Sequence, residues 1–535
     1  MTTPGTATDV ADAFHVYDTT LRDGSQREGL TLSVNDKLAV ATYLDDLGVG
    51  FIEGGWPGAN PKDAAFFRRA AAGDLTLRHA QLAAFGATRK AGTVAADDPQ
   101  VRALLEAQTP VVTLVAKSHV GHVERALRTT REENLAMVGD TVRFLVGEGR
   151  RVFLDAEHFF DGYRLDREYA LAVVRAAAEA GADVVALCDT NGGMLPGPLA
   201  DVVHEVAGRG LRVGIHAHND TACAVANSLA AVDAGATHVQ GTANGYGERA
   251  GNADLFAVVA ALELKAGREV LPGGSLADLV RVSHAIAEVA NIAPDDHQPW
   301  VGASAFAHKA GLHASALKVD PDLYQHTDPA LVGNDMRVLV SELAGRASIE
   351  LKARELDIAV DRETVGRVIE RVKQMEAAGY TFEAAEASFE LLLREEVEGE
   401  RRRFFELESY RVISENLPAG ADGPGAHVSE ATVKLHVKGE RFVATGEGNG
   451  PVNALDRALR QALERLHPQL GSFELVDYKV RILEGAHGTG AVTRVLVRTS
   501  NGVREWDTVG VDENVISASW QALDDAYTFG LLHAG

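Results

Sequence analysis

The feature that most constrains the fold is a regular alternation of short β-rich runs with Ala-rich helical segments, from Phe14 to about residue 265. We predict eight strands: FHVYDT, FIEGGWP from Phe51, QLAAFGA from Gln81, VVTLVAKS from Val111, RVFLDAEHF from Arg151, VVALCDT from Val184, RVGIHAH from Arg212 and HVQGTANG from His238. Eight strand-then-helix units in about 250 residues are typical of a (β/α)8 TIM barrel. A doubly wound open sheet is the competing fold, but no Gly-x-Gly-x-x-Gly follows the first strand.

The predicted helices have recognisable ends. SVNDKLAVATYLDDLG places Ser33 and Asp36 at capping-box spacing and finishes at Gly48. REYALAVVRAAAEAG and TACAVANSLAAVDAG show apolar i, i+3, i+4 spacing and also end in glycine. In a barrel of this kind, the loops after the strands build the active site.

The pattern changes after the barrel, and we predict three domains. Residues 1–285 form the catalytic barrel, and residues 286–415 form mostly helical, charged linker subdomains. A turn-rich boundary, ENLPAGADGPGAH, leads to an α+β domain over residues 428–535 with a duplicated β-β-α unit, in which Thr445 matches Thr508 and Val452 matches Val515. Such a module senses a ligand or binds a partner, unless it only aids assembly.

Composition excludes several classes of protein. With 52 Lys and Arg against 76 Asp and Glu, the net charge is −24, which disfavours binding to nucleic acid. Two cysteines, Cys188 and Cys223, exclude a disulfide scaffold and a thiolate zinc cluster. We find neither a signal peptide at the start nor an apolar run of about 20 residues. We therefore expect a cytoplasmic protein that does not contact membranes.

The motif HAHND indicates a metal site. His216 and His218 are two residues apart on a predicted strand, so their side chains share one face, which in a closed barrel is the interior. A single strand histidine is more often structural, but two of them at the barrel mouth favour metal ligation.

Oxygen ligands are available beside the two imidazoles. Asp23, in VYDTTLRDGSQ, follows the first strand, which neighbours the eighth in a closed barrel, and Asn252 lies in GYGERAGN after the eighth. This mixed nitrogen and oxygen set favours Mg, Mn or Zn with positions left open for water or substrate. An α-keto acid suits an open metal beside Arg22, which is placed to steady the developing alkoxide.

Two further residues at the strand ends are candidates for chemistry. Glu157, in DAEHFFDG, is the best-placed carboxylate for proton transfer, or else a partner of a ligand histidine. Thr190, in CDTNGG, either binds the substrate carboxylate or caps the following turn.

Together, YDTTLRDGSQ, HAHND and GYGERAGN resemble the acyl-CoA-condensing barrel family of 2-isopropylmalate, homocitrate and citramalate synthases, and the resemblance covers nearly the whole chain. FIEGGWPGANP, AAFGATRK, ALRTTREENLAMV and DAEHFFDGY look most like the citramalate synthase branch. Where isopropylmalate synthases usually have Ala-Gly-Phe-Pro, this chain has Gly54-Gly55-Trp56-Pro57.

The resemblance implies a Claisen condensation of acetyl-CoA with pyruvate, which gives (R)-citramalate and free CoA after thioester hydrolysis. It assigns the metal to Asp23, His216, His218 and Asn252. It also implies a homodimer in which linker residues His313 and Tyr324 cover a barrel mouth, with the base drawn from Glu157, His313 and Tyr324. Glu53 is expected to contact the substrate, and isoleucine is the expected effector of the C-terminal domain.

Four alternatives stay open. A 2-isopropylmalate synthase shares the chemistry but accepts 2-oxoisovalerate. A lyase of the hydroxymethylglutaryl-CoA type resembles the barrel, but its catalytic cysteine is missing from GTANGYGERAGN. A two-His-one-carboxylate iron oxygenase also chelates keto acids, and an amino-acid sensor with an inert barrel needs no catalysis.

Overall fold

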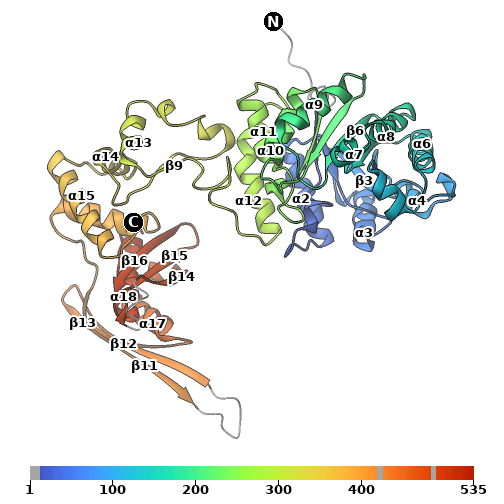
Figure 1. Cartoon of the computed structure of the whole chain (residues 1–535). Helices are drawn as coiled ribbons and strands as arrows, with labels where there is room; N and C mark the ends of the chain where they lie inside the picture. Colours follow the sequence, from blue (N-terminus) through green and yellow to red (C-terminus); the bar gives the residue numbers. More distant parts are fainter. Residues whose placement is uncertain (1–12, 418–425, 484–489, 535) are drawn as a thin grey trace. The chain divides into compact units, whose positions relative to one another are not determined.

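Eight parallel strands close into a barrel in chain order in the computed structural model, which describes residues 13–417, 426–483 and 490–534 (Figure 1). This confirms the predicted (β/α)8 barrel. Its strands are β1 (His15–Asp18), β2 (Phe51–Glu53), β3 (Gln81–Ala87), β4 (Val111–Lys117), β5 (Arg151–Glu157), β6 (Val184–Asp189), β7 (Val213–Ala217) and β8 (His238–Gly241). Strand β1 pairs with both β2 and β8, so the two ends of the barrel sequence meet.

The outer helices begin and end where their caps predict. Helix α2 (Val34–Leu47) has the complete Ser33–Asp36 capping box and ends at Gly48 with φ 92°, in the left-handed region that favours glycine. The other helices of this part are α3 (Pro61–Arg69), α4 (Pro99–Glu106), α5 (Val120–His122), α6 (Arg131–Gly147), α7 (Phe159–Leu165), α8 (Arg167–Glu179), α9 (Pro196–Ala207), α10 (Ala224–Asp233), α11 (Leu255–Leu264) and α12 (Leu279–Val289).

Strand β2 is shorter than predicted, and the two glycines after it pack against helix α3. A Cβ on Gly54 would lie 2.5 Å from the Phe66 ring, and one on Gly55 would lie 2.4 Å from the Asp63 carboxyl carbon. The Trp56 amide donates a 2.8 Å hydrogen bond to Asp63 of α3. Backbone hydrogen bonds of 3.0 Å from Gly54 to Ala83 and from Phe85 to Gly55 still tie the two glycines to β3, so the contact with the sheet continues past Glu53.

An apolar layer crosses the barrel interior, with buried polar side chains on both sides of it, among them His15 and His238 at the amino ends of β1 and β8. Buried side chains from six strands form one cluster: Tyr17, Phe51, Ala83, Val111, Phe153 and Val184. The Tyr17 hydroxyl lies at its boundary and contacts both Thr113 and Glu53. In this fold the carboxyl ends of the strands and the loops after them carry the active site.

Residues up to 306, together with 327–335, form one compact unit, and the other described residues form a second, which we describe separately. The second unit begins with β9 (Ala307–His308), α13 (Gly311–Leu317), β10 (Arg337–Val338), α14 (Arg346–Glu355), α15 (Arg362–Ala377) and α16 (Glu386–Glu398). Buried residues such as Ile349, Val368 and Phe389 form the core between α14, α15 and α16.

The C-terminal part contains two copies of a β-β-β-α unit, one strand longer than the predicted β-β-α repeat. The first is β11 (Glu406–Leu417), β12 (Ala426–Val437), β13 (Glu440–Gly448) and α17 (Pro451–Leu463). The second is β14 (Glu474–Ile482), β15 (Thr493–Ser500), β16 (Glu505–Asp512) and α18 (Val515–Leu532). Most of the predicted boundary, residues 418–425, and the first 12 residues lie outside the described structure.

The predicted match of Thr445 with Thr508 is wrong by one residue. Val433 pairs with Ala444 in the first sheet, and Val497 pairs with Thr508 in the second. Thr508 is buried and donates to the Ala522 carbonyl of α18, whereas Thr445 is exposed. Because successive strand side chains point to opposite faces, Ala444 is the true equivalent of Thr508.

No helix in the described ranges is long and apolar enough to cross a membrane.

Candidate active site

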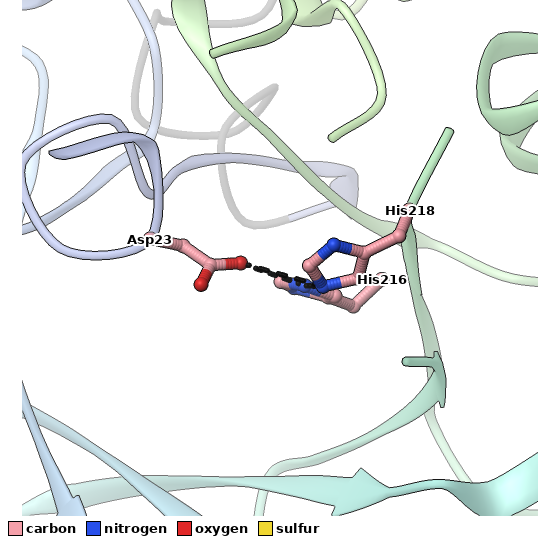
Figure 2. A group of neighbouring side chains, drawn as sticks. All are labelled: Asp23, His216 and His218. Atoms are coloured by element: carbon pink, nitrogen blue, oxygen red, sulfur yellow. Dashed lines mark hydrogen bonds and ion pairs between the residues drawn. The ribbon is translucent and has the colours of Figure 1, made fainter. Parts of the chain in front are cut away.

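Asp23, His216 and His218 converge at the carboxyl end of the barrel (Figure 2). Asp23 follows β1, His216 lies on β7 and His218 follows β7. One ligand atom from each residue lies within 4.8 Å of the others. The Asp23 carboxylate is 3.1 Å from His216 Nε2, and the two Nε2 atoms are 3.2 Å apart. Residues far apart in the sequence therefore present one carboxylate and two imidazoles to one point.

Asn252 lies beside these three residues. It follows β8 and forms an isolated bridge with His218. Its Nδ2 lies 2.7 Å from Asp23 and 3.3 Å from His216, while its Oδ1 is buried without a hydrogen-bond partner among the described residues. The two ends of an amide are assigned from their partners, and rotating this amide would direct the unpartnered oxygen at the same point, where a bound cation would offset its repulsion from the Asp23 carboxylate. The donor set thus fits a divalent cation with mixed nitrogen and oxygen ligands.

The charges of these groups are strongly coupled. Burial alone would raise the pKa of Asp23, but the Arg22 guanidinium and the histidines hold it well below its usual value. Burial would lower the pKa of His216, but its contact with Asp23 outweighs this and raises it. Burial and the neighbouring His216 lower the pKa of His218 to about 3. A carboxylate and a neutral imidazole are thus already in the states that bind a metal.

Arg22 is held rigidly next to the three residues. Its Nε donates to Glu53 at 2.6 Å and its NH1 donates to Asp23 at 2.9 Å. The guanidinium carbon lies 3.9 Å from the centre of the Phe85 ring. Among the described residues, two of the five N–H donors of Arg22 are engaged in this way, and the Asp155 carboxylate lies 3.9 Å from NH2, beyond hydrogen-bond distance, so the other donors can reach a ligand.

Glu53 holds Arg22 in place by a direct hydrogen bond. The carboxylate is fully buried and accepts hydrogen bonds of 2.6 Å from Tyr17, Thr19 and Arg22. Each oxygen accepts from at least one protein donor, Oε1 from Tyr17 and Oε2 from both Thr19 and Arg22, which fixes the carboxylate against the guanidinium. Glu53 therefore affects the reaction by holding Arg22 in position.

Glu157 and Thr190 lie at the ends of neighbouring strands. The Glu157 carboxylate pairs with Lys117 of β4. The Thr190 hydroxyl accepts a 2.8 Å hydrogen bond from the His158 amide, so it contacts the loop after β5 rather than its own turn. Because it accepts in that bond, its hydrogen is available for donation to a substrate.

His313 and Tyr324 belong to the second unit. Their ring centres are 4.1 Å apart, and Tyr324 is 41% exposed. The two side chains thus form one aromatic pair that is accessible from outside the unit.

Three residues beside the site were not predicted: Phe85 under Arg22, Asp155 on β5 and Gln240 on β8. Asp155 lies two residues before Glu157 on the same strand, so the two side chains share one face of that strand. This spacing could have predicted that Asp155 faces the site. Burial raises the pKa of Asp155 to about 6.

Three family models match successive parts of this chain. The HMGL-like family model matches residues 13–286, the homocitrate synthase post-HMGL domain-like model matches 300–379, and the LeuA allosteric (dimerisation) domain model matches 383–531. The (R)-citramalate synthase of Streptomyces coelicolor is 68% identical over 527 residues, 98% of each chain. That of Synechocystis is 49% identical over 96% of each chain. A probable 2-isopropylmalate synthase of Methanopyrus kandleri is 34% identical over 96% of this chain and 97% of its own.

Proposed function

Because the chain belongs to the HMGL-like family and to the (R)-citramalate synthase family, we propose that it condenses acetyl-CoA with pyruvate and releases (R)-citramalate and free CoA. It is an acyltransferase that converts the acyl group to an alkyl group on transfer. The observation that carries this proposal is the convergence of Asp23, His216 and His218 beside the rigid Arg22.

A divalent cation, Mg, Mn or Zn, would be held by Asp23, His216, His218 and the Asn252 oxygen. When bound, it supplies Lewis-acid polarisation of the keto group of pyruvate. The protein contributes a site with few ligands, which leaves positions for the substrate oxygens.

Arg22 stabilises the negative charge that develops on the keto oxygen. Its free N–H groups are fixed before the reaction by Glu53, Asp23 and Phe85, so no reorganisation is needed as charge develops. Thr190 donates its hydroxyl hydrogen to the carboxylate of pyruvate. Together they orient the keto acid for attack on one face.

The base that removes a methyl proton from acetyl-CoA comes from the set Glu157, His313 and Tyr324. Glu157 lies on the same barrel as Arg22, and His313 and Tyr324 form a ring pair in the second unit. By the family resemblance, this pair would act at the barrel mouth of the other subunit in a homodimer. The resulting enolate attacks the keto carbon, and water then cleaves the thioester.

The C-terminal part is the site of assembly and control. Its match to the LeuA allosteric (dimerisation) domain supports a homodimer and an amino-acid effector, for which isoleucine, downstream of citramalate, is the candidate. Irreversible thioester hydrolysis makes this step a suitable point for feedback in isoleucine biosynthesis.

A thiol-release assay with acetyl-CoA tests the proposal against its rivals. We expect CoA release with pyruvate to exceed that with 2-oxobutyrate, 2-oxoisovalerate and 2-oxoglutarate, and the product to be (R)-citramalate by chiral chromatography. Preference for 2-oxoisovalerate would make the chain an isopropylmalate synthase. No release with any acid would favour an inert sensor, and net cleavage of the product would favour a lyase.

A further inference from the structure

A chain of hydrogen bonds inside the barrel connects the candidate metal site to a glutamine with no assigned role. Gln240 lies on β8 directly opposite His216 of β7 in the strand register. His216 Nδ1 and Gln240 Oε1 are 2.7 Å apart, and Gln240 is only 1% exposed. Because the pair is buried, no water competes for this contact.

The orientation of the Gln240 amide is fixed by its other partners. Its Nε2 donates to the Asp155 carboxylate at 2.8 Å and lies 3.2 Å from His238 Nε2. Rotating the amide would place its oxygen against the Asp155 carboxylate, so the nitrogen must stay there. The oxygen must therefore face His216.

This orientation determines which nitrogen of His216 carries the hydrogen. A neutral imidazole has one N–H, and an amide oxygen accepts only from a donor, so the hydrogen lies on Nδ1. In this neutral form, which is the one that binds a metal, the lone pair is on Nε2, the atom 3.1 Å from Asp23 and 3.2 Å from His218 Nε2. By contrast, His218 Nδ1 is buried without a hydrogen-bond partner among the described residues.

We propose that Gln240, anchored by Asp155, is a positioning residue that selects the metal-binding tautomer and ring orientation of His216. Asp155 also lies 3.9 Å from Arg22 NH2, so one carboxylate supports both the metal ligand and the arginine. The inference rests on the metal site of the proposed function. Outer hydrogen-bond partners of this kind typically change metal affinity by about 10–100-fold.

The test is a titration of the full-length, chelator-treated protein with Mn²⁺, in which electron paramagnetic resonance measures free Mn²⁺. Gln240→Met keeps the side-chain length and removes the hydrogen bond to His216, so we expect an affinity about 10–100-fold weaker than that of the unsubstituted chain.

The exchange variant Gln240→Glu/Asp155→Asn keeps the net charge and restores both bonds. The amide introduced at position 155 donates to the carboxylate introduced at position 240, and that carboxylate also accepts from His216 Nδ1. The exchange variant should bind Mn²⁺ within about threefold of the unsubstituted chain, a loss far smaller than the range expected for Gln240→Met.

Thermal unfolding and circular dichroism identify variants that are folded. Unchanged affinity in folded Gln240→Met would overturn the inference, and so would equal losses in the two folded variants, because the exchange restores the hydrogen bonds. If Gln240→Met does not fold, Gln240→Leu, which also lacks an acceptor for His216, takes its place: binding weaker than in the exchange variant supports the inference, and equal affinity contradicts it. If the unsubstituted chain binds no Mn²⁺, the proposed metal site itself has failed, which is a different result.

Discussion

Replacing Glu53 by glutamine tests the role assigned to Arg22. Glutamine has the shape of glutamate and can keep every contact: its oxygen accepts from Thr19 and Arg22, and its amide donates to the Tyr17 hydroxyl. That hydroxyl is 2.6 Å from Thr113, to which it can donate in turn. The substitution therefore removes the charge opposite Arg22 while the fold is kept.

The expected loss follows from the type of hydrogen bond that changes. A buried bond to a charged partner contributes about 1.5–3 kcal/mol, against about 0.5–1.5 kcal/mol for a neutral one. If the loss of this charged bond reduces the stabilisation of the transition state by Arg22 by about 1.4 kcal/mol, kcat falls about tenfold. Because Arg22 acts on charge that develops during the reaction, KM for acetyl-CoA should change by less than about twofold.

The measurement is steady-state thiol release, with denaturant unfolding as the check on stability. Glu205→Gln is the matched control, since Glu205 also accepts from a tyrosine, Tyr163, and from an arginine, Arg167, but on outer helices. The control should retain full turnover. A kcat for Glu53→Gln that equals that of the control would refute the idea that Glu53 holds Arg22 for catalysis.

Three further predictions follow from the site and from the C-terminal repeat. His218→Ala should abolish both Mn²⁺ binding and thiol release while isoleucine still binds, and surviving turnover would contradict the metal site. Because contact with Asp23 raises the pKa of His216, the metal-free protein keeps a proton there to higher pH than an ordinary histidine does, and a metal must displace that proton. Metal affinity should thus fall as pH falls, by up to about tenfold per pH unit below that pKa, and calorimetry should detect proton release on binding. An affinity that does not change with pH would contradict the displacement of a proton from His216. Gly510→Ala places a Cβ 1.9 Å from the Ala518 carbonyl of α18 and should destabilise the C-terminal part by about 1–3 kcal/mol. The control Gly366→Ala, in α15 with no neighbour within 4 Å, should stabilise by up to about 1 kcal/mol, and equal unfolding midpoints would contradict this packing.

The fold was predictable where local chemistry and periodicity agree. The run from Gln81 to Ala87 is a strand over its full length, and the Ser33–Asp36 box starts a helix as expected. The three clustered ligands were predictable because barrel closure brings the first and seventh strand ends together. In each case the sequence pattern is compatible with one local structure, which the protein adopts.

The remainder depends on contacts that a sequence does not display. The repeat was shifted by one residue because Thr445 and Thr508 have the same side chain but lie on opposite faces of their strands. Glu53 and Gln240 could not be assigned their partners, because those partners come from other strands, and only the barrel register brings them together. Side chains that act through another residue are therefore the hardest to find from sequence.

The central claim is that Asp23, His216 and His218 hold one divalent ion beside Arg22. The most direct measurement is a crystal structure of the protein soaked with Mn²⁺ and pyruvate, with anomalous scattering recorded above the manganese edge. The account predicts a single strong peak about 2.0–2.3 Å from the Asp23 carboxylate and from Nε2 of both histidines. A protein that turns over in the same solution but shows its manganese peak elsewhere, or none, would contradict it.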